Sequence, residues 1–575
     1  MDIAKRDLDP VRGVPDIYTP TVAEIIRRFS LFSTVKMLVV VDGGISLTEA
    51  PSAFGVGRLV RLLRESRIGC KHFDVELATR EGVQSTNATP AANQPRYTGF
   101  RFDQTEGGQA SINRYHQIWC FGFNPDNNAG PDSNITQSFR NPTSDEELAT
   151  LTTWMNTRRG GVLAIGDHDY LGASMCHRIP RIRSMRRWTN AQGVPPIGGA
   201  LRHDTNQPFT PGQLAGSEEI PFLAQEDSKP QSIEWVPWMT ERVSIFKLRK
   251  RPHPVLCHPS LGPINVMPDH PHEGWCYDDD EIDVTATYAF GDVAGDEYPT
   301  VNGEQPRPTV IAYGHTTPDP PYQLEKGRSP RKRFGMVSVY DGHAANVGRV
   351  ATDSTWHHVF DENIQGIEQA GGDNWAKISR YYLNLASWLT PPGVGQWCLF
   401  TEVLKTHFTY LGFQEYVRSA SAFSLGQSLH LHLQRQLGAC WVSQWVFDVL
   451  KIIDLDLWAA LKEWVRPDPA RATLGLASPS FEALELAILG GLVRATFPIA
   501  DALKEQAHKV AFSVDAHDHA KKAAHRVDVD LADKVQLEGA AIGLAELRSA
   551  LTRSAKDLEI FLRPGTPAKG GDCRG

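Results

Sequence analysis

A nearly continuous run of apolar and β-branched residues, 35–41 (VKMLVVV), ends directly in Asp42-Gly43-Gly44. Such a run is typical of a strand that is buried on both faces, as in a parallel sheet covered by helices. Helical patterns at 54–66 and 144–158 supply connections long enough for parallel crossovers. Together these segments predict a doubly wound, mostly parallel α/β sheet. Its further strands are expected at 71–78, 117–123 and 162–166, and later ones at 309–313, 336–340 and 348–352.

The whole chain has 575 residues, more than one hydrophobic core normally organises. Pro391-Pro392 ends a predicted helix at 374–389, and the pattern beyond it is helical almost throughout. The predicted parts are an N-terminal extension (1–34), an α/β domain (35–390) with a long insertion rich in proline, glycine and acidic residues (about 190–300), an all-α domain (391–563) and a disordered tail (564–575).

Composition limits the partners of this chain. A formal net charge of −8 argues against a general nucleic-acid binder, which needs a basic face. The best candidate for a membrane span, 484–493, is far shorter than the about 20 residues that cross a bilayer. The first residues are charged and lack the apolar segment of a signal peptide, and the eight cysteines form no CxxC pair. We therefore expect a soluble cytoplasmic protein with reduced thiols and no membrane or nucleic-acid partner.

Acidic residues and histidines follow several predicted strands, at the edge where open α/β sheets bind ligands. Asp42 follows the first strand, Asp167 and His168 follow the strand at 162–166, and Asp353 begins a segment that leads to His357-His358. Carboxylates with imidazoles suit zinc, iron or manganese. They equally suit a general acid and base without a metal.

No segment has a diagnostic metal spacing, and any one of these side chains could instead cap a helix or bond a backbone carbonyl. The loop 269–273 (DHPHE) is nevertheless rich in nitrogen and oxygen donors. The predicted ligands of a divalent metal are His168, Asp169, His270, His272, Glu273 and His357.

Five arginines lie in the segment 177–188 (HRIPRIRSMRRW), just after the strand at 162–166. Guanidinium groups favour bidentate contacts with carboxylates and phosphates, so one interpretation is an anionic substrate bound here. The other is a set of ion pairs or an interface, for example with the acidic residues 278–281. The predicted substrate-binding residues are Asp42, Arg181, Arg183, Arg186 and Arg187.

Four segments resemble one superfamily, the class I glutamine amidotransferase-like proteins, and within it the trehalose-utilisation (ThuA-like) branch. They are RGGVLAIGDHDYLG (159–172), the stretch from His253 to Tyr277, GRVATDSTWHH (348–358) and YYLNLASWL (381–389). The resemblance implies a flavodoxin-like sheet and a sharp turn between strand and helix at Gly166-Asp167-His168. Amidotransferases carry a cysteine on this turn, and here a histidine stands instead, so hydrolysis of glutamine by a thiolate is not expected.

These observations favour an enzyme of hydrolase or lyase type that acts on a small polar or anionic substrate, with or without a divalent metal. The predicted catalytic residues are Asp167, His168, His357 and His358. The alternative is a non-catalytic scaffold protein that binds a sugar or nucleotide and assembles, as a homo-oligomer, through its helical domain. Catalysis requires His168 and the His357-His358 segment to share one cavity, whereas a scaffold does not.

Overall fold

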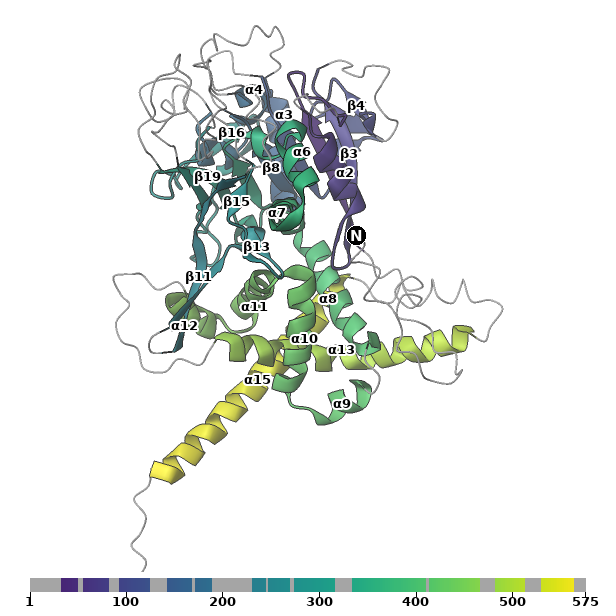
Figure 1. The fold of residues 1–575 in the computed structure, drawn as a ribbon, viewed down its shortest axis with the longest axis vertical. Coiled ribbons are helices and arrows are strands. Elements are labelled where there is room, and N and C mark those ends of the chain that lie inside the picture. The colour runs from purple at the N-terminus through teal and green to yellow at the C-terminus, as the bar shows by residue number, and fades with distance from the viewer. Residues whose placement is uncertain are drawn as a thin grey trace, which may run out of the picture.

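The structure is a computed structural model, and its ribbon is shown in Figure 1. It describes residues 33–49, 55–81, 93–124, 142–167, 171–188, 230–244, 247–268, 274–315, 333–409, 413–465, 481–511 and 529–562. Ser33 and Thr34 already belong to the first strand, and the remainder of the predicted extension lies outside the described residues. The predicted tail, 564–575, lies outside them as well.

A mixed sheet with mostly parallel strands forms the centre of the first part, in the order β10-β18-β19-β20-β8-β7-β1-β3-β2, with β4 paired to β3. The strands β20, β8, β7, β1 and β3 are parallel neighbours, which confirms the prediction for the segments at 35–41, 117–123 and 162–166. β19 is antiparallel to β20, and β18 and β10 continue this antiparallel edge. The bounds are β1 (Ser33–Val41), β2 (Arg67–Ile68), β3 (Lys71–Thr79), β4 (Tyr97–Thr98), β7 (Gln117–Phe121), β8 (Gly161–Ile165), β10 (Glu234–Trp235), β18 (Thr309–His315), β19 (Arg333–Tyr340) and β20 (Val350–Asp353).

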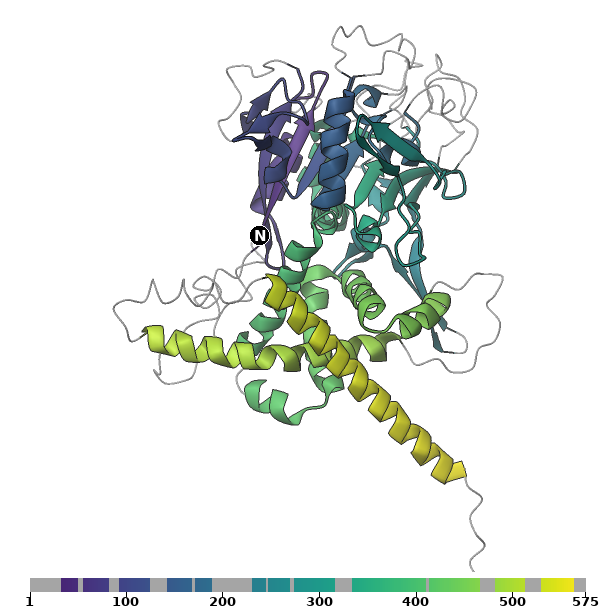
Figure 2. The same cartoon turned by 180° about the vertical axis from the view of Figure 1, so that it is seen from behind.

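Helices cover both faces of this sheet. Alternate residues of β1 explain why: Val39 packs into one core and Val40 into the other. The helices α2 (Gly57–Glu65), α6 (Asp361–Ala370) and α7 (Gly372–Trp388) lie on the face seen in Figure 1. The helix α3 (Asp145–Thr157) lies on the opposite face, as Figure 2 shows, and begins with the capping box of Ser144 and Glu147. Smaller helices are α4 (Ala173–Cys176) and α5 (Ile182–Met185).

The segment that the sequence predicts as an insertion is more integrated than expected. Its strand β10 extends the main sheet, and the hairpin β11–β12 reaches from the sheet to the helical region (Figure 1). There the rings of Trp238 and Phe447 lie 6.4 Å apart, and Arg251 pairs with buried Glu485 at 2.9 Å. The small strands are β5 (Thr105–Glu106), β6 (Gln109–Ala110), β9 (Gln231–Ser232), β11 (Pro237–Ser244), β12 (Lys247–Pro252), β13 (Cys257–His258), β14 (Gly262–Pro263), β15 (Val266–Met267), β16 (Thr287–Phe290) and β17 (Val293–Asp296).

The described part of the chain after the sheet is helical, as predicted. Three of its helices cross closely because glycines replace side chains at the crossings. A Cβ at Gly426 would lie 1.7 Å from the Leu486 carbonyl oxygen, and one at Gly543 would lie 2.0 Å from that of Ala487. The helices are α8 (Pro392–Thr409), α9 (Phe413–Ser419), α10 (Ala422–Leu437), α11 (Ala439–Ile453), α12 (Leu455–Val465), α13 (Phe481–Ala511) and α15 (Val529–Leu562).

This helical region is bonded to the sheet part through buried groups. Ile68 and Met239 belong to the same apolar cluster as the helices α10, α11 and α13. A fragment ending at residue 392 would expose them and would leave Arg251 without its carboxylate partner. This interface weighs against an all-α domain that can be deleted without unfolding the sheet part.

One described helical segment, Phe481–Leu503, is long and apolar enough to cross a membrane, with a mean hydropathy of 1.5. The run 484–493, which was predicted to be too short to span a bilayer, lies within this longer segment. Inside the fold 61% of this segment is buried, as in the core helix of a water-soluble protein. Gly490 and Gly491 let it approach its neighbours, so its apolar character is explained by packing against α10 and α15.

Candidate functional site

The strand β8 leads into a tight reversal of the chain. The Asp167 amide donates to the Leu171 carbonyl at 3.0 Å, so the two arms of the turn meet within four residues. A Cβ at Gly166 would lie 2.2 Å from the Leu171 oxygen, and Gly172 has a φ of +91°, which favours glycine. The described ends of the predicted turn, Asp167 and Leu171, therefore lie together, and the short helix α4 follows. His168 and Asp169 lie outside the described residues.

His357 lies beside this turn, on the 3-10 turn η10 (Trp356–His358) that follows β20. Its Nε2 is 3.6 Å from the Asp167 carboxylate, and both side chains are fully buried. Its Nδ1 is 2.8 Å from Oδ1 of Asn363, and the Glu362 carboxylate is 3.8 Å away. An amide oxygen can only accept, so Nδ1 carries a proton and Nε2 is the nitrogen directed at Asp167. The structure thus brings together two of the four predicted catalytic residues.

His358, the adjacent residue, has different surroundings. Its Nδ1 is 2.6 Å from the Asp353 carboxylate, and its Nε2 is 3.2 Å from the Gln231 amide nitrogen. The Tyr381 hydroxyl donates to the other Asp353 oxygen at 3.0 Å. Both ring nitrogens of His358 are engaged by buried side chains, so the imidazole joins β20 to β9. The prediction did not distinguish the two histidines, whereas the structure gives His357 and His358 different neighbours.

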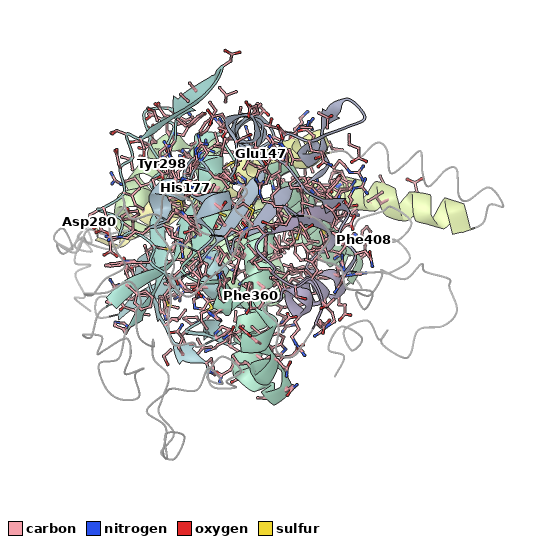
Figure 3. The ribbon with its side chains drawn as sticks, turned by 90° about the horizontal axis from the view of Figure 1, so that it is seen from above. Glu147, His177, Asp280, Tyr298, Phe360 and Phe408 are labelled. Carbon is pink, nitrogen blue, oxygen red and sulfur yellow. The ribbon has the colours of Figure 1, made fainter. Side chains whose placement is uncertain are left out.

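A stack of aromatic rings lies beside the imidazole of His357. The ring of Trp356 lies 4.0 Å from it and stacks on Phe360 at 4.7 Å and on Phe123 at 5.8 Å. Figure 3 looks onto this edge of the sheet, with Phe360 labelled. These rings lower the local polarity, which strengthens the interaction between an imidazole and a carboxylate.

Asp42 forms a second polar group at the same edge. One of its carboxylate oxygens accepts from the backbone amides of Phe123 and of Asn124, the latter at 3.1 Å. The Asn124 side chain donates to the Glu81 carboxylate at 2.6 Å. The backbone carbonyl of Asn124 accepts from the amides of Gly172 and Ser174 at 3.1 Å each. Burial, and then the nearby Glu81 carboxylate, raise the pKa of Asp42 to about 7. Asp42 therefore supports the far arm of the turn after β8 through Asn124.

The predicted substrate-binding arginines are engaged inside the fold. Arg186 is fully buried and donates to the carbonyls of Asp167 at 2.7 Å, Ser354 at 2.8 Å and Asp353 at 3.1 Å, so it ties the ends of β8 and β20 together. Burial lowers the pKa of its guanidinium, and nearby thiols and carboxylates oppose this. Arg183 pairs with the Glu297 carboxylate, and Arg187 contacts Glu281 at 3.1 Å. The Arg181 guanidinium donates instead to the Glu297 backbone carbonyl at 2.7 Å and to the Asn156 amide oxygen at 2.6 Å. These contacts agree with the alternative interpretation, ion pairs within the protein.

The predicted metal site cannot be assembled from the described residues. Of its six ligands only His357 is described, because His168, Asp169, His270, His272 and Glu273 lie outside the described ranges. Within those ranges no three His, Cys, Asp or Glu side chains are grouped so that they could hold a metal. Gly274, at the end of the predicted ligand loop, donates to the Ser354 carbonyl at 3.0 Å and so returns this loop to the edge beside β20.

Sequence reasoning missed Asn363, Glu362, Glu81 and Asn124. Asn363 and Glu362 lie in the first turn of α6, where polar residues usually serve the helix end. Glu81 follows β3 as Asp42 follows β1, and Asn124 lies just past β7. Their position after predicted strands is the one signal that could have identified these last two.

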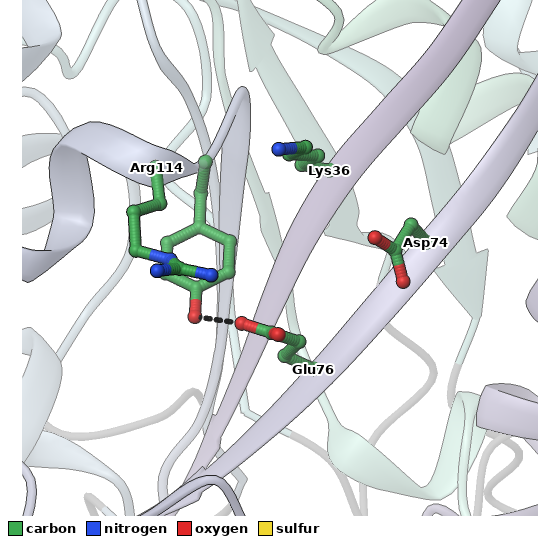
Figure 4. A pocket seen from close by; sticks show the side chains of 5 residues that line it. Lys36, Asp74, Glu76 and Arg114 are labelled. Atoms are coloured by element: carbon green, nitrogen blue, oxygen red, sulfur yellow. Dashed lines mark hydrogen bonds between the residues drawn. The ribbon is translucent and has the colours of Figure 1, made fainter.

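A small polar hollow lies elsewhere on the described surface. It has a cavity volume of about 20 Å³ and is lined by Lys36, Asp74, Glu76, Arg114 and Tyr115. Figure 4 shows the Tyr115 hydroxyl bonded to Glu76 across it. This space holds little more than a water molecule, so it is not a ligand site.

Comparisons with protein-family models, with curated proteins and with solved structures found no match to this chain. The resemblance to glutamine amidotransferase-like and ThuA-like proteins rests on its four sequence segments alone.

Proposed function

We propose that this protein is an enzyme of hydrolase or lyase type, acting on a small polar substrate at the carboxyl edge of the sheet. One observation carries the proposal: Nε2 of the buried His357 faces the Asp167 carboxylate at 3.6 Å, beside a tight turn at the end of β8. An imidazole that faces a carboxylate is a common arrangement in general acid and base catalysis.

In this proposal His357 moves the proton. Asn363 accepts the hydrogen bond from Nδ1 and fixes the ring orientation, so that Nε2 is the exchanging nitrogen. Asp167 orients the imidazole and stabilises its protonated form. Arg186, bound to the carbonyl of Asp167 at 2.7 Å, is a positioning residue, because it fixes the backbone from which that carboxylate extends. His168 would act at the centre of the turn, as the ThuA-like resemblance implies.

The strand order supports assigning the sheet to the flavodoxin-like class. The five parallel strands are β1, β3, β7, β8 and β20, and we number them 1 to 5 along the chain. Their order across the sheet is then 2-1-3-4-5. This is the order of flavodoxin-like folds, in which ligands bind beyond the carboxyl ends of the strands. Asp42, Asp167 and His357 all follow strands of this set, at that edge.

The proposal is tested by a panel of small esters, amides, lactones and glycosides, assayed with the full chain and with His357→Asn. We expect turnover of at least one class, reduced about 100-fold or more in the variant, which is within the usual range for a lost acid or base. His258→Asn is a control, since His258 lies on β13 and its ring accepts from the backbone amides of Ser260 and Leu261. Equal turnover by wild type and His357→Asn would contradict the proposal.

A second candidate is the non-catalytic scaffold, in which the sheet edge binds a sugar or nucleotide and the helical region assembles copies of the chain. The observation that favours it is burial: Asp167 and His357 have no exposed side-chain surface. A catalytic pair must be reached by its substrate, whereas a structural pair need not be. Binding without turnover, unaffected by His357→Asn, would favour this candidate.

A further inference from the structure

Three neighbouring parallel strands, β3, β1 and β7, each end close to a side chain that carries oxygen. Asp42 directly follows β1, Glu81 lies just past β3, and Asn124 lies just past β7. The chain passes from β1 to β3 on one side and returns to β7 on the other, so the strand order reverses at β1. Open α/β sheets bind ligands beyond the carboxyl ends of the strands at such a reversal.

Hydrogen bonds hold the two carboxylates of this group beside each other. The backbone amide of Asn124 donates to Oδ1 of Asp42 at 3.1 Å, and its side-chain amide donates to Oε1 of Glu81 at 2.6 Å. The Gly43 amide, next to Asp42 in the chain, donates to the other Glu81 oxygen at 3.0 Å. Two negative groups are thus fixed around one shared residue. Burial, and then Glu81, raise the pKa of Asp42 to about 7, which agrees with two carboxylates that repel each other.

Two oxygen atoms of the same group lack a partner. Asp42 is 2% exposed and Asn124 is 0% exposed. Oδ2 of Asp42 and Oδ1 of Asn124 nevertheless form no hydrogen bond within the part of the chain that the structure describes. Gly43, with a φ of +64°, leaves room beside the second atom, because a Cβ there would lie 2.8 Å from it. A buried carboxylate oxygen without a donor is unfavourable, so these two atoms point to a positively charged ligand.

The surroundings leave room for an added positive charge. Arg80, the residue before Glu81, pairs with the fully buried Glu147 at 2.7 Å, so its guanidinium charge is matched by a third carboxylate. Glu81 itself is only partly buried, and a small cation can approach the group from its side.

We propose that Asp42, Glu81 and Asn124 form a binding site for a hard divalent cation, which we assign as Mg²⁺. The ligands are Oδ2 of Asp42, Oδ1 of Asn124 and the Glu81 carboxylate, whose hydrogen-bonded oxygens each keep a second lone pair. All three residues offer oxygen, which suits Mg²⁺ better than zinc. Mg²⁺ usually takes one or two carboxylates and keeps several waters, so no third acidic residue is needed.

This site is distinct from the predicted zinc, iron or manganese site. It shares no residue with the predicted ligands around His168. Its donors also differ from a group of three His, Cys, Asp or Glu side chains, which the described residues lack. It uses neither His357 nor Asp167, so its test requires no catalytic activity, and the failure of one proposal does not decide the other.

The test is calorimetric titration of the full chain with magnesium chloride, after treatment with EDTA and its removal. We expect saturable binding to the wild-type chain. Asp42→Asn and Glu81→Gln should each weaken it about 10-fold or more, because each removes one ligand charge. Asp42→Asn keeps a side-chain oxygen for the backbone amides of Phe123 and Asn124, so the local structure is retained. Mg²⁺ should also raise the Tm of the wild type more than that of either variant.

Asp74→Asn is the matched control, because Asp74 is an exposed carboxylate on β3, the strand that Glu81 follows. Its binding of Mg²⁺ should equal that of the wild type. A wild-type chain that does not bind Mg²⁺, or that binds it no better than Asp42→Asn and Glu81→Gln, would overturn the proposal. Binding that Asp74→Asn weakens to the same extent would assign the signal to general surface charge and would overturn the proposal as well.

Discussion

The crossing of α13 and α10 depends on the absence of a side chain at Gly490. A Cβ there would lie 1.8 Å from the Ala422 carbonyl oxygen and 2.5 Å from its carbon. Real Cβ contacts are at least 3.0 Å, so Gly490→Ala requires the two backbones to separate by 3.0 − 1.8 = 1.2 Å. Because the obstacle is backbone, no change of rotamer can relieve it.

The expected cost follows from two opposing terms. Overpacking of a close crossing costs about 3 kcal/mol, because buried residues such as Leu425 and Ile488 lose contacts when the helices move apart. Alanine is favoured over glycine inside a helix by about 1 kcal/mol, which offsets part of this. We therefore expect Gly490→Ala to destabilise the helical region by about 2 kcal/mol.

Gly395→Ala is the matched control, since Gly395 also lies inside a helix, α8, and a Cβ there would meet nothing within 4 Å. Gly395→Ala should raise the free energy of unfolding of the helical region by up to about 1 kcal/mol. Urea denaturation of the full chain, followed by circular dichroism at the helical minimum, measures both. If Gly490→Ala is as stable as Gly395→Ala, the helices do not cross as the structure shows.

Three further predictions concern the sheet edge. Replacing His358 with Asn should lower the free energy of unfolding by about 3 kcal/mol, because it leaves the buried Asp353 without its closest partner. Thermal melting measures this loss, and His357→Asn should show a smaller one. The folded-state pKa of Asp42, about 7, lies above its ordinary value of 3.8, so its contribution to stability is present at low pH and is lost as the pH rises through 7. Asp42→Asn should flatten that decline in a series of melts from pH 4 to 8, and an unchanged slope would contradict the assignment. His168→Ala should lower the content of zinc, iron or manganese measured by elemental analysis, and should leave the thermal melt of the metal-free protein unchanged. A wild-type protein that carries no stoichiometric metal would refute the metal hypothesis.

The central sheet could be predicted because its strands are local and strongly patterned. The run before Asp42 is apolar on both faces, and the capping box at Ser144 marks the start of α3. The hairpin β11–β12 could not be predicted, because its sequence is charged and contains proline, and its partners Glu485 and Phe447 lie about 200 residues further along the chain. A helix crossing that depends on glycine likewise has no signature in the sequence of either helix alone.

The position of the candidate site could be predicted from the sequence, but the partners of its side chains could not. Residues after strands were expected to meet at one edge, and Asp167 and His357 do so. Adjacent histidines cannot be told apart from sequence, because only the turn η10 directs one at Asp167 and the other at Asp353. The arginines were interpreted by charge alone, and their partners, Glu297 and several backbone carbonyls, depend on tertiary contacts.

The most direct test of the account is the pH dependence of kcat/KM for a substrate found in the panel, compared between wild type and Asp167→Asn. If His357 exchanges the proton and Asp167 stabilises its charged form, removal of the carboxylate makes the imidazole less basic. The limb of the profile due to His357 should then move to lower pH by about one unit or more, with a reduced maximum. A profile for Asp167→Asn that coincides with that of wild type would contradict it.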